Sequence, residues 1–421
     1  MSPPGSRYER LSRAELAVLI PELLLIGQLI DRSGMAWCIG AFGRSEMLGI
    51  AIEEWAGASP IYTRRMQKAL RFTGEDVITI FKGLQFDIGA PPQFMDFRFT
   101  VHDRWHGEFR LDHCGALLDV EPMGPDYVTG MCHDIEDPTF DATAIATNAR
   151  ARVRPIHRPP RRPADRQPHC AWTVTIDESY PEAVGIPALE VIAATGAATW
   201  RLPEIDPADE GAADYSGALL SDIDFAAFSH SALVRIAEEV CLQMHLLNLS
   251  FGLAVRKRVG TDTDLARSIC LRQLTGIAGV AAERIRRALG LPADRAGLIR
   301  TLELHPLLNP SGYVVADLAG GRLHVSPSPA HDDGAWIALC GPGSPEPIQA
   351  APVQAAPIQA IATAVDPLLR VRITGTDTDW TAEFERVDTA LAESVEVAVT
   401  KVSRGAAFEF QPRRSLPLTV L

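Results

Sequence analysis

The chain has 421 residues, of which 47% are hydrophobic and 22% charged, and this composition is typical of a globular protein with more than one folded unit. Its formal net charge of -13 argues against a general nucleic-acid or membrane-surface binder, because neutralising phosphate requires an excess of lysine and arginine. The seven cysteines show no paired spacing, which favours reduced thiols in a cytoplasmic protein over a disulfide framework.

Helical signals come first along the chain. Ser12 and Glu15 form a capping box, so an apolar helix is predicted from there to about Cys38, with a break at Pro21. A second helix is predicted over about 47–70, and a third follows it within a few residues. The first half of the chain therefore begins as a helical layer.

The most apolar run, residues 16–30, needs a decision between a soluble helix and a membrane helix. It is shorter than the roughly 20 apolar residues that a spanning helix requires, and Glu22 and Gln28 interrupt it. Glu15 and the lack of a small-residue cleavage site argue against a signal peptide. We therefore expect no membrane association.

Short alternating runs follow the helices and predict strands. Their spacing leaves no room for helical crossovers, so the sheet is predicted to be antiparallel. The predicted strands of this half are 94–101, 108–114, 127–133, 150–157 and 170–176.

The same order then repeats. Ser229 caps a predicted helix that runs to about Arg258, with further helices over about 264–289 and 292–302. The predicted strands of the second half are 313–318, 322–326, 336–340, 369–374 and 380–387. The markers that recur in order are Gly57/Gly276, Arg65/Arg284, Ala69/Ala288, Leu70/Leu289, Cys132/Cys340, Ala144–Thr147/Ala360–Thr363, Arg152–Arg154/Arg370–Arg372 and Trp172/Trp380.

We therefore predict an α+β fold with an internal duplication. The first copy spans 1–178, a connector 179–221, the second copy 222–387, and C-terminal strands or a tail 388–421. The stretch 347–361, with its repeated Pro-x-Gln-Ala pattern, is expected to be an extended, poorly ordered loop. The sequence leaves open whether the copies are two domains or one pseudo-symmetric domain.

Three of the seven cysteines have a histidine neighbour, and all of them lie in the first copy: His113-Cys114, Cys132-His133 and His169-Cys170. Because successive strand side chains point to opposite faces, each pair can give one member to a common centre. The predicted metal ligands under the sheet are His113, His157, Cys170 and either Cys132 or His133, a set that suits zinc or another divalent transition metal. The alternative is that these are ordinary core residues.

A thiol mechanism is the other chemistry that these residues allow. The predicted catalytic residues are Cys114, Cys132, His133, Asp134 and Glu136. A thiolate needs a nearby base or cation, and Cys114 with His133, or Cys132 with His113, are the couples that two strands can bring together. The acids that follow Cys132 can supply a general acid or base, or can form a merely solvated turn.

Two arginines on one strand face, Arg152 and Arg154, are predicted to bind an anionic small-molecule substrate, and a structural salt bridge is an equal alternative. The sequence contains no P-loop, dinucleotide fingerprint or G-x-S-x-G elbow, so no nucleotide cofactor and no serine-hydrolase chemistry are expected.

The helical layer carrying Ile52-Glu-Glu-Trp55, followed by a strand ending in Leu111-Asp-His-Cys114 and a second cysteine strand, resembles L-2-amino-thiazoline-4-carboxylic acid hydrolase-like proteins over residues 12–178. The resemblance implies hydrolysis of a C–N or related bond in a small molecule. The sequence thus predicts a small-molecule hydrolase or a related lyase. The alternatives are a non-catalytic metal- or ligand-binding protein, such as a thiol sensor, and a purely structural pseudo-dimer.

Overall fold

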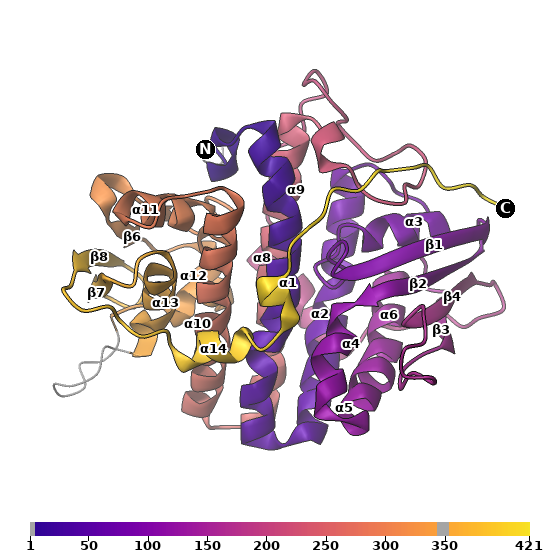
Figure 1. Cartoon of the computed structure of the whole chain (residues 1–421), viewed down its shortest axis with the longest axis horizontal. Helices are drawn as coiled ribbons and strands as arrows, with labels where there is room; N and C mark the ends of the chain where they lie inside the picture. Colours follow the sequence, from indigo (N-terminus) through magenta and orange to yellow (C-terminus); the bar gives the residue numbers. More distant parts are fainter. Residues whose placement is uncertain (1–4, 343–352) are drawn as a thin grey trace.

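The computed structural model describes residues 5–342 and 353–421 and has an α+β fold with two similar halves (Figure 1). Each half has a helical layer followed by a four-stranded antiparallel sheet. The main elements of the first half are α1 (Arg13–Phe42), α2 (Arg44–Ala69), α3 (Val77–Leu84), β1 (Met95–Asp103), β2 (His106–Cys114), α4 (Gly115–Val120), α5 (Pro125–Thr129), the π-helix η3 (Gly130–Ile135), α6 (Glu136–Ile145), β3 (Ala151–His157) and β4 (Cys170–Ile176).

The second half repeats this order, and short elements connect and complete the halves. Its main elements are α9 (His230–Val259), α10 (Thr263–Ala288), α11 (Arg295–Leu304), β5 (Ala316–Asp317), β6 (Leu323–Val325), α12 (Pro329–Asp333), η7 (Trp336–Leu339), α13 (Ala356–Val365), β7 (Leu369–Gly375) and β8 (Trp380–Arg386). The remaining helices include α7 (Pro187–Ala193) and α8 (Gly196–Thr199) in the connector, and α14 (Val395–Thr400) and η9 (Arg404–Ala407) after the second sheet.

Local sequence accounts for the start of each helical layer. The Ser12 side chain accepts a hydrogen bond from the Glu15 N–H, and the Glu15 carboxylate accepts from the Ser12 N–H, so the predicted capping box is present. The Ser229 side chain caps α9 by accepting from the Ala232 N–H at 3.3 Å, without a reciprocal carboxylate. The predicted break at Pro21 is wrong: α1 continues through it, because the helix is buried along its length and packing outweighs one missing donor.

The two sheets share one strand order. It is β1-β2-β4-β3 in the first half and β5-β6-β8-β7 in the second. In the first sheet Phe109 lies opposite Trp172, and both pack on the buried face with Phe97. This face and the helices above it enclose the candidate site described below.

Several predicted strands are absent from the described residues. The segment 127–133 belongs to α5 and the π-helix, because Pro125 opens a helix after Gly124, whose φ of 107° favours glycine. The segment 336–340 forms η7, and only Ala316–Asp317 of 313–318 pairs as a strand. Alternating short apolar runs do not distinguish a strand from a buried helical turn.

The loop predicted over 347–361 needs correction. Residues 353–361 are helical, in η8 (Val353–Ala355) and α13, and the rest of that stretch lies outside the described residues. The C-terminal segment, predicted as strands or a tail, holds two short helices and continues as an extended tail. It then crosses to the first half as an extended chain (Figure 1), where the Leu421 N–H donates to the Val101 carbonyl.

The long helices α1, α2, α9 and α10 pack together in the middle of the molecule, with one sheet on each side (Figure 1). Two ion pairs repeat across this bundle: Arg65 to Glu239 at 2.8 Å and Arg284 to Glu22 at 2.5 Å. Each joins a second helix of one half to a first helix of the other half. The bundle is therefore pseudo-symmetric, and both halves share one hydrophobic core.

The recurring glycines lie at the same contact. A Cβ atom on Gly57 would lie 2.3 Å from Ser250 Oγ, and one on Gly276 would lie 2.5 Å from Ser33 Oγ. Only glycine permits this approach of the helices. The duplication in the sequence thus coincides with contacts between the halves, while a common origin of the halves stays a prediction.

Among the described residues, the structure contains no helix with the length and apolar character needed to cross a membrane.

Candidate functional site

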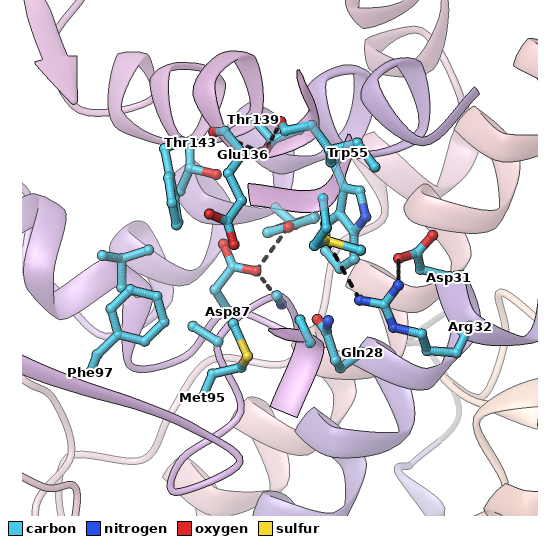
Figure 2. A pocket seen from close by; sticks show the side chains of 18 residues that line it. Gln28, Asp31, Arg32, Trp55, Asp87, Met95, Phe97, Glu136, Thr139 and Thr143 are labelled. Carbon is cyan, nitrogen blue, oxygen red and sulfur yellow. Dashed lines mark hydrogen bonds and ion pairs between the residues drawn. The ribbon is translucent and has the colours of Figure 1, made fainter. Parts of the chain in front are cut away.

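A partly open cavity lies between α1, α2, α6 and the inner face of the first sheet, with about 620 Å³ of empty space when its open mouth is included (Figure 2). Its walls combine apolar side chains such as Phe97 and Met95 with an unusual number of buried polar groups. The polar groups that matter for chemistry are Gln28, Asp31, Arg32, Tyr62, Asp87 and Glu136.

The π-helix Gly130–Ile135 forms one wall of this cavity. It joins α5 to α6 without a break and places Met131 and Ile135 at the cavity. Gly130 lets it approach α2, because a Cβ atom there would lie 2.9 Å from a methyl group of Leu48. Single π-turns inside helices are frequent at functional sites, and Glu136 follows this one directly.

Glu136 is the most unusual group of the cavity. The residue is 8% exposed, and its Oε2 atom has no hydrogen-bond partner among the described residues. Burial raises the pKa of Glu136 to about 8, against the opposing charges of Arg158 and Arg32. At neutral pH this carboxyl group is therefore mainly protonated and can donate a proton.

Asp87 differs from Glu136 in its hydrogen bonds. It accepts from the Tyr62 hydroxyl at 2.9 Å and from the Gly89 N–H at 2.7 Å. Burial raises its pKa to about 6, and these donors limit the rise. Asp87 is therefore mainly ionised at neutral pH. Figure 2 shows the carboxyl groups of Asp87 and Glu136 pointing toward one another in the cavity.

A second acidic pair lies beside the first. Asp31 is 3% exposed and faces the cavity, and Glu54 is fully buried behind it with neither carboxyl oxygen bonded within the described structure. Burial raises the pKa of both. Arg32 forms ion pairs with Asp31 at 3.2 Å and with Asp119 at 3.7 Å.

The second half has neutral groups at the matching positions. Aligning the equal-length helices from Ser12 and Ser229 onward places Asn248 at Asp31, and aligning α2 with α10 places Gln273 at Glu54. The Asn248 amide donates to Gln273 Oε1 at 3.2 Å, and the Gln273 amide donates to the Ile30 carbonyl at 3.4 Å, so these amides are hydrogen-bonded. The unsatisfied acids thus belong to the first half, which is where the sequence placed the reactive groups.

A larger apolar cavity adjoins the first. It has about 1050 Å³ of empty space between α1, α2 and α5, and Met131 and Ile135 line both cavities. Its other walls are mainly apolar, with Met35, Met47 and Leu48 from the helices. Arg32 lies where the two cavities meet and donates to the Met131 sulfur at 3.8 Å.

The predicted thiols lie near this site without lining it. Cys114, Cys132 and Cys170 are all buried. Burial and the charge of Glu136 raise the pKa of Cys114 to about 12 and raise those of Cys132 and Cys170 as well. The thiols are therefore neutral at physiological pH, the opposite of an activated nucleophile.

Cys114 also has a structural role. It ends β2 and caps α4, accepting from the Leu117 N–H at 3.3 Å. The predicted strand faces are reversed here, with Cys114 buried and His113 half-buried, because a register shift between Met95 and Phe97 disrupts the alternation.

The predicted histidines are engaged with the backbone. His113 donates to the Phe94 carbonyl at 2.9 Å, and His133 donates to the Pro159 carbonyl at 2.7 Å. His157 is half-buried, and burial lowers its pKa. Within the described ranges, neither predicted Cys–His couple forms a hydrogen bond, and the predicted metal ligands do not gather into a group of three.

The remaining predicted residues also lie outside the cavity. Asp134 is exposed. Arg154 forms an ion pair with Asp141 at 2.9 Å, and Arg152 donates to the Ala151 carbonyl at 2.7 Å. These arginines therefore serve local structure, and only Glu136 of the predicted set reaches the cavity.

Sequence reasoning missed Asp31, Glu54 and Asp87. A signal was present for two of them, since Asp31 and Glu54 align with the amides Asn248 and Gln273 of the second copy.

A different group of residues is able to hold a metal ion. His102, His106 and Glu108 offer ligand atoms that all lie within 4.8 Å of one another, at the β1–β2 hairpin. Val101 and Phe109 alternate with them into the core, so the group lies on the outer face of the sheet, away from the cavity. Two imidazoles and a carboxylate suit zinc or a related divalent metal.

Zinc is expected to bind the full chain in a 1:1 ratio at this group. His106→Ala removes one ligand and should weaken binding about tenfold or more, measured by calorimetric titration with Zn²⁺. His324→Ala, in the second half, removes a histidine with a single acidic neighbour, Asp379, and should leave the affinity unchanged. Equal affinity of the His106→Ala variant and the unaltered chain would refute the site.

No protein-family model matches this chain, and neither curated proteins nor solved structures show a significant match to it. The resemblance to L-2-amino-thiazoline-4-carboxylic acid hydrolase-like proteins therefore stays a prediction.

Proposed function

We propose that this protein is an enzyme that performs general acid–base chemistry on a small molecule in the first-half cavity, most simply as a hydrolase. One observation carries the proposal: two buried carboxyl groups face one cavity with pKa values of about 6 and about 8. Environments that separate two pKa values in this way assign a base and an acid.

The roles follow from the protonation states. Ionised Asp87 accepts a proton from water as the water oxygen attacks the substrate, and Tyr62 and the Gly89 N–H hold the carboxylate in place. Protonated Glu136 donates its proton to the leaving group as the bond to that group breaks. The net change is addition of water, and a proton returned from Asp87 to Glu136 restores the starting state.

This assignment changes the chemistry expected from sequence. The thiol mechanism loses support because the cysteines are neutral and do not line the cavity. The His102, His106 and Glu108 group lies on the other face of the sheet, so no step of the proposed reaction uses it. Hydrolysis of a C–N bond is compatible with acid–base catalysis by two carboxyl groups.

The test is a panel of small amides, lactams, imidates and esters with the full chain, followed by variants on any substrate that is turned over. Glu136→Gln and Asp87→Asn each remove one proton-transfer group and should lower kcat/KM by about a hundredfold or more. Asp134→Asn, an exposed acid two residues from Glu136, should leave kcat/KM unchanged.

The pH profile of kcat/KM gives a second readout. It should rise through the Asp87 pKa of about 6, fall through the Glu136 pKa of about 8, and lose only the alkaline limb in Glu136→Gln. No turnover across the panel, or full turnover in both variants, refutes the proposed chemistry.

One observation favours a second candidate function. The neighbouring cavity, with a volume of about 300 Å³ open to water-sized molecules and mainly apolar walls, has room to hold a small ligand without any reaction. A non-catalytic ligand-binding protein would bind the same molecules with no turnover and no dependence on Asp87.

A further inference from the structure

We infer that the two adjoining cavities of the first half bind an amphipathic amine, with its N–H groups among the acids of the inner cavity and its apolar body in the outer one. The inference rests on the site of the proposed function and names its ligand class. It replaces the anionic substrate that the sequence suggested.

The inner cavity contains buried oxygen atoms that accept no hydrogen bond from the described residues. Gln28 Oε1, Asp31 Oδ1 and Glu136 Oε2 have no hydrogen-bond partner in the described structure, and each of these residues lines the inner cavity. All three residues are less than 9% exposed. Buried acceptors are costly unless a donor reaches them, so a ligand that brings donors is favoured.

The inner cavity has few positively charged groups that could bind an anion. Arg32 is the one cation that lines the inner cavity within the described residues, and it is already paired with Asp31 and Asp119. A carboxylate ligand would face ionised Asp87 with no free cation, and the protonated Glu136 carboxyl would be the one acidic group able to donate to it. An ammonium group has three N–H donors and no acceptor, which is the complement of this lining.

An apolar cavity adjoins the inner cavity. Met131 and Ile135 form the boundary between the cavities, so a molecule of modest length can have its polar end in one and its apolar body in the other. Methionines such as Met35, Met47 and Met131 adapt to ligands of different shape. The polar end is therefore specified more strictly than the apolar body.

The second half lacks two of the buried acids of the first half and can be compared with it. Its amides Asn248 and Gln273 stand at the positions of Asp31 and Glu54, and they are joined by a hydrogen bond. The acids of the first half are not needed for the shared fold, which the second half builds without them. Their presence is explained if they meet a ligand.

The experiment is calorimetric titration of the full chain at pH 7 with three matched probes: 4-phenylbutylamine, 4-phenylbutanol and 4-phenylbutanoate. The amine should bind about tenfold or more tightly than either of the others, because only it fills the acceptors with donors. Binding of the amine should also release protons, seen as a buffer-dependent heat, since an ammonium group drives a protonated carboxyl to ionise.

Two variants separate the two ends of the ligand. Asp31→Asn should weaken the amine about tenfold or more while leaving the alcohol nearly unchanged. Leu48→Trp should weaken both probes by reducing the apolar cavity, and circular dichroism checks that both variants are folded.

Equal or tighter binding of the carboxylate, or unchanged amine binding in Asp31→Asn, overturns the inference. These outcomes are independent of turnover. If Glu136→Gln abolishes turnover but the probes show no amine preference, only the ligand class is refuted. If the amine preference holds but no substrate is turned over, only the proposed catalysis is refuted.

Discussion

Replacing Arg284 with methionine is expected to lower the free energy of unfolding by about 3 to 5 kcal/mol. The Arg284 side chain is fully buried, and its guanidinium pairs with Glu22 at 2.5 Å. It also donates to the carbonyls of Gly405, Ala406 and Phe408 at 2.7 to 3.0 Å. Methionine fills similar space, so the loss comes from a buried carboxylate and carbonyls left without their partner.

Urea denaturation followed by circular dichroism measures this loss. The matched control is Arg287→Met, one turn away on an exposed surface. Arg287 makes one long, exposed hydrogen bond to the Ala406 carbonyl at 3.4 Å, so its loss should change stability by no more than about 0.5 kcal/mol. Because the bonded carbonyls belong to the C-terminal segment, Arg284→Met should also expose that segment to limited proteolysis. A stability change as small as that of the control would show that Arg284 does not hold the bundle and the segment together.

The second large effect is a loss of stability from the buried carboxyl groups as the pH rises from about 4.5 to about 8. Below the pKa that it has in the unfolded chain, a buried carboxyl group is protonated in both the folded and the unfolded state, so it does not lower the free energy of unfolding. Above that pH the unfolded chain ionises first, so each pH unit costs up to about 1.4 kcal/mol per group until the folded pKa is passed. Glu238 contributes to this loss up to its folded pKa of about 7, and Glu136 up to its folded pKa of about 8. Burial raises the pKa of Glu54 too, so Glu54 acts in the same direction.

The double variant Asp31→Asn/Glu54→Gln tests this directly, since it copies the amide pair of the second half. It is expected to be more stable than the unaltered chain at pH 8, and the difference should shrink toward pH 5, because burial raises the pKa of both acids. Urea denaturation at both pH values gives the two differences. The buried histidines, whose pKa values are lowered, change the stability of the variant and of the unaltered chain equally, so their effect cancels in the difference.

Asp134→Asn is the control, because this exposed acid should give no pH-dependent difference. If the double variant is less stable than the unaltered chain at pH 8, the buried acids are stabilised by contacts other than those described, and their role as a ligand site weakens. If it is more stable and binds amines poorly, the acids trade stability for binding.

The sequence by itself determined the parts of this protein that depend on local chemistry. Ser12 and Ser229 mark the helix starts because a capping side chain acts within one turn, and β4 was predicted at its observed bounds because alternation over 170–176 is a local property. The recurring Gly57 and Arg65 markers indicated two similar halves, although only the structure shows that they contact the other half.

Tertiary structure decided the site. The cavity collects side chains from α1, α2, the loop after α3, and the π-helix and α6, and no sequence spacing encodes that meeting. It also decided which groups are reactive, because burial raised the thiol pKa values and moved Glu136 and Asp87 toward neutrality. Local periodicity assigns a residue to a face, but desolvation depends on every element that packs over it.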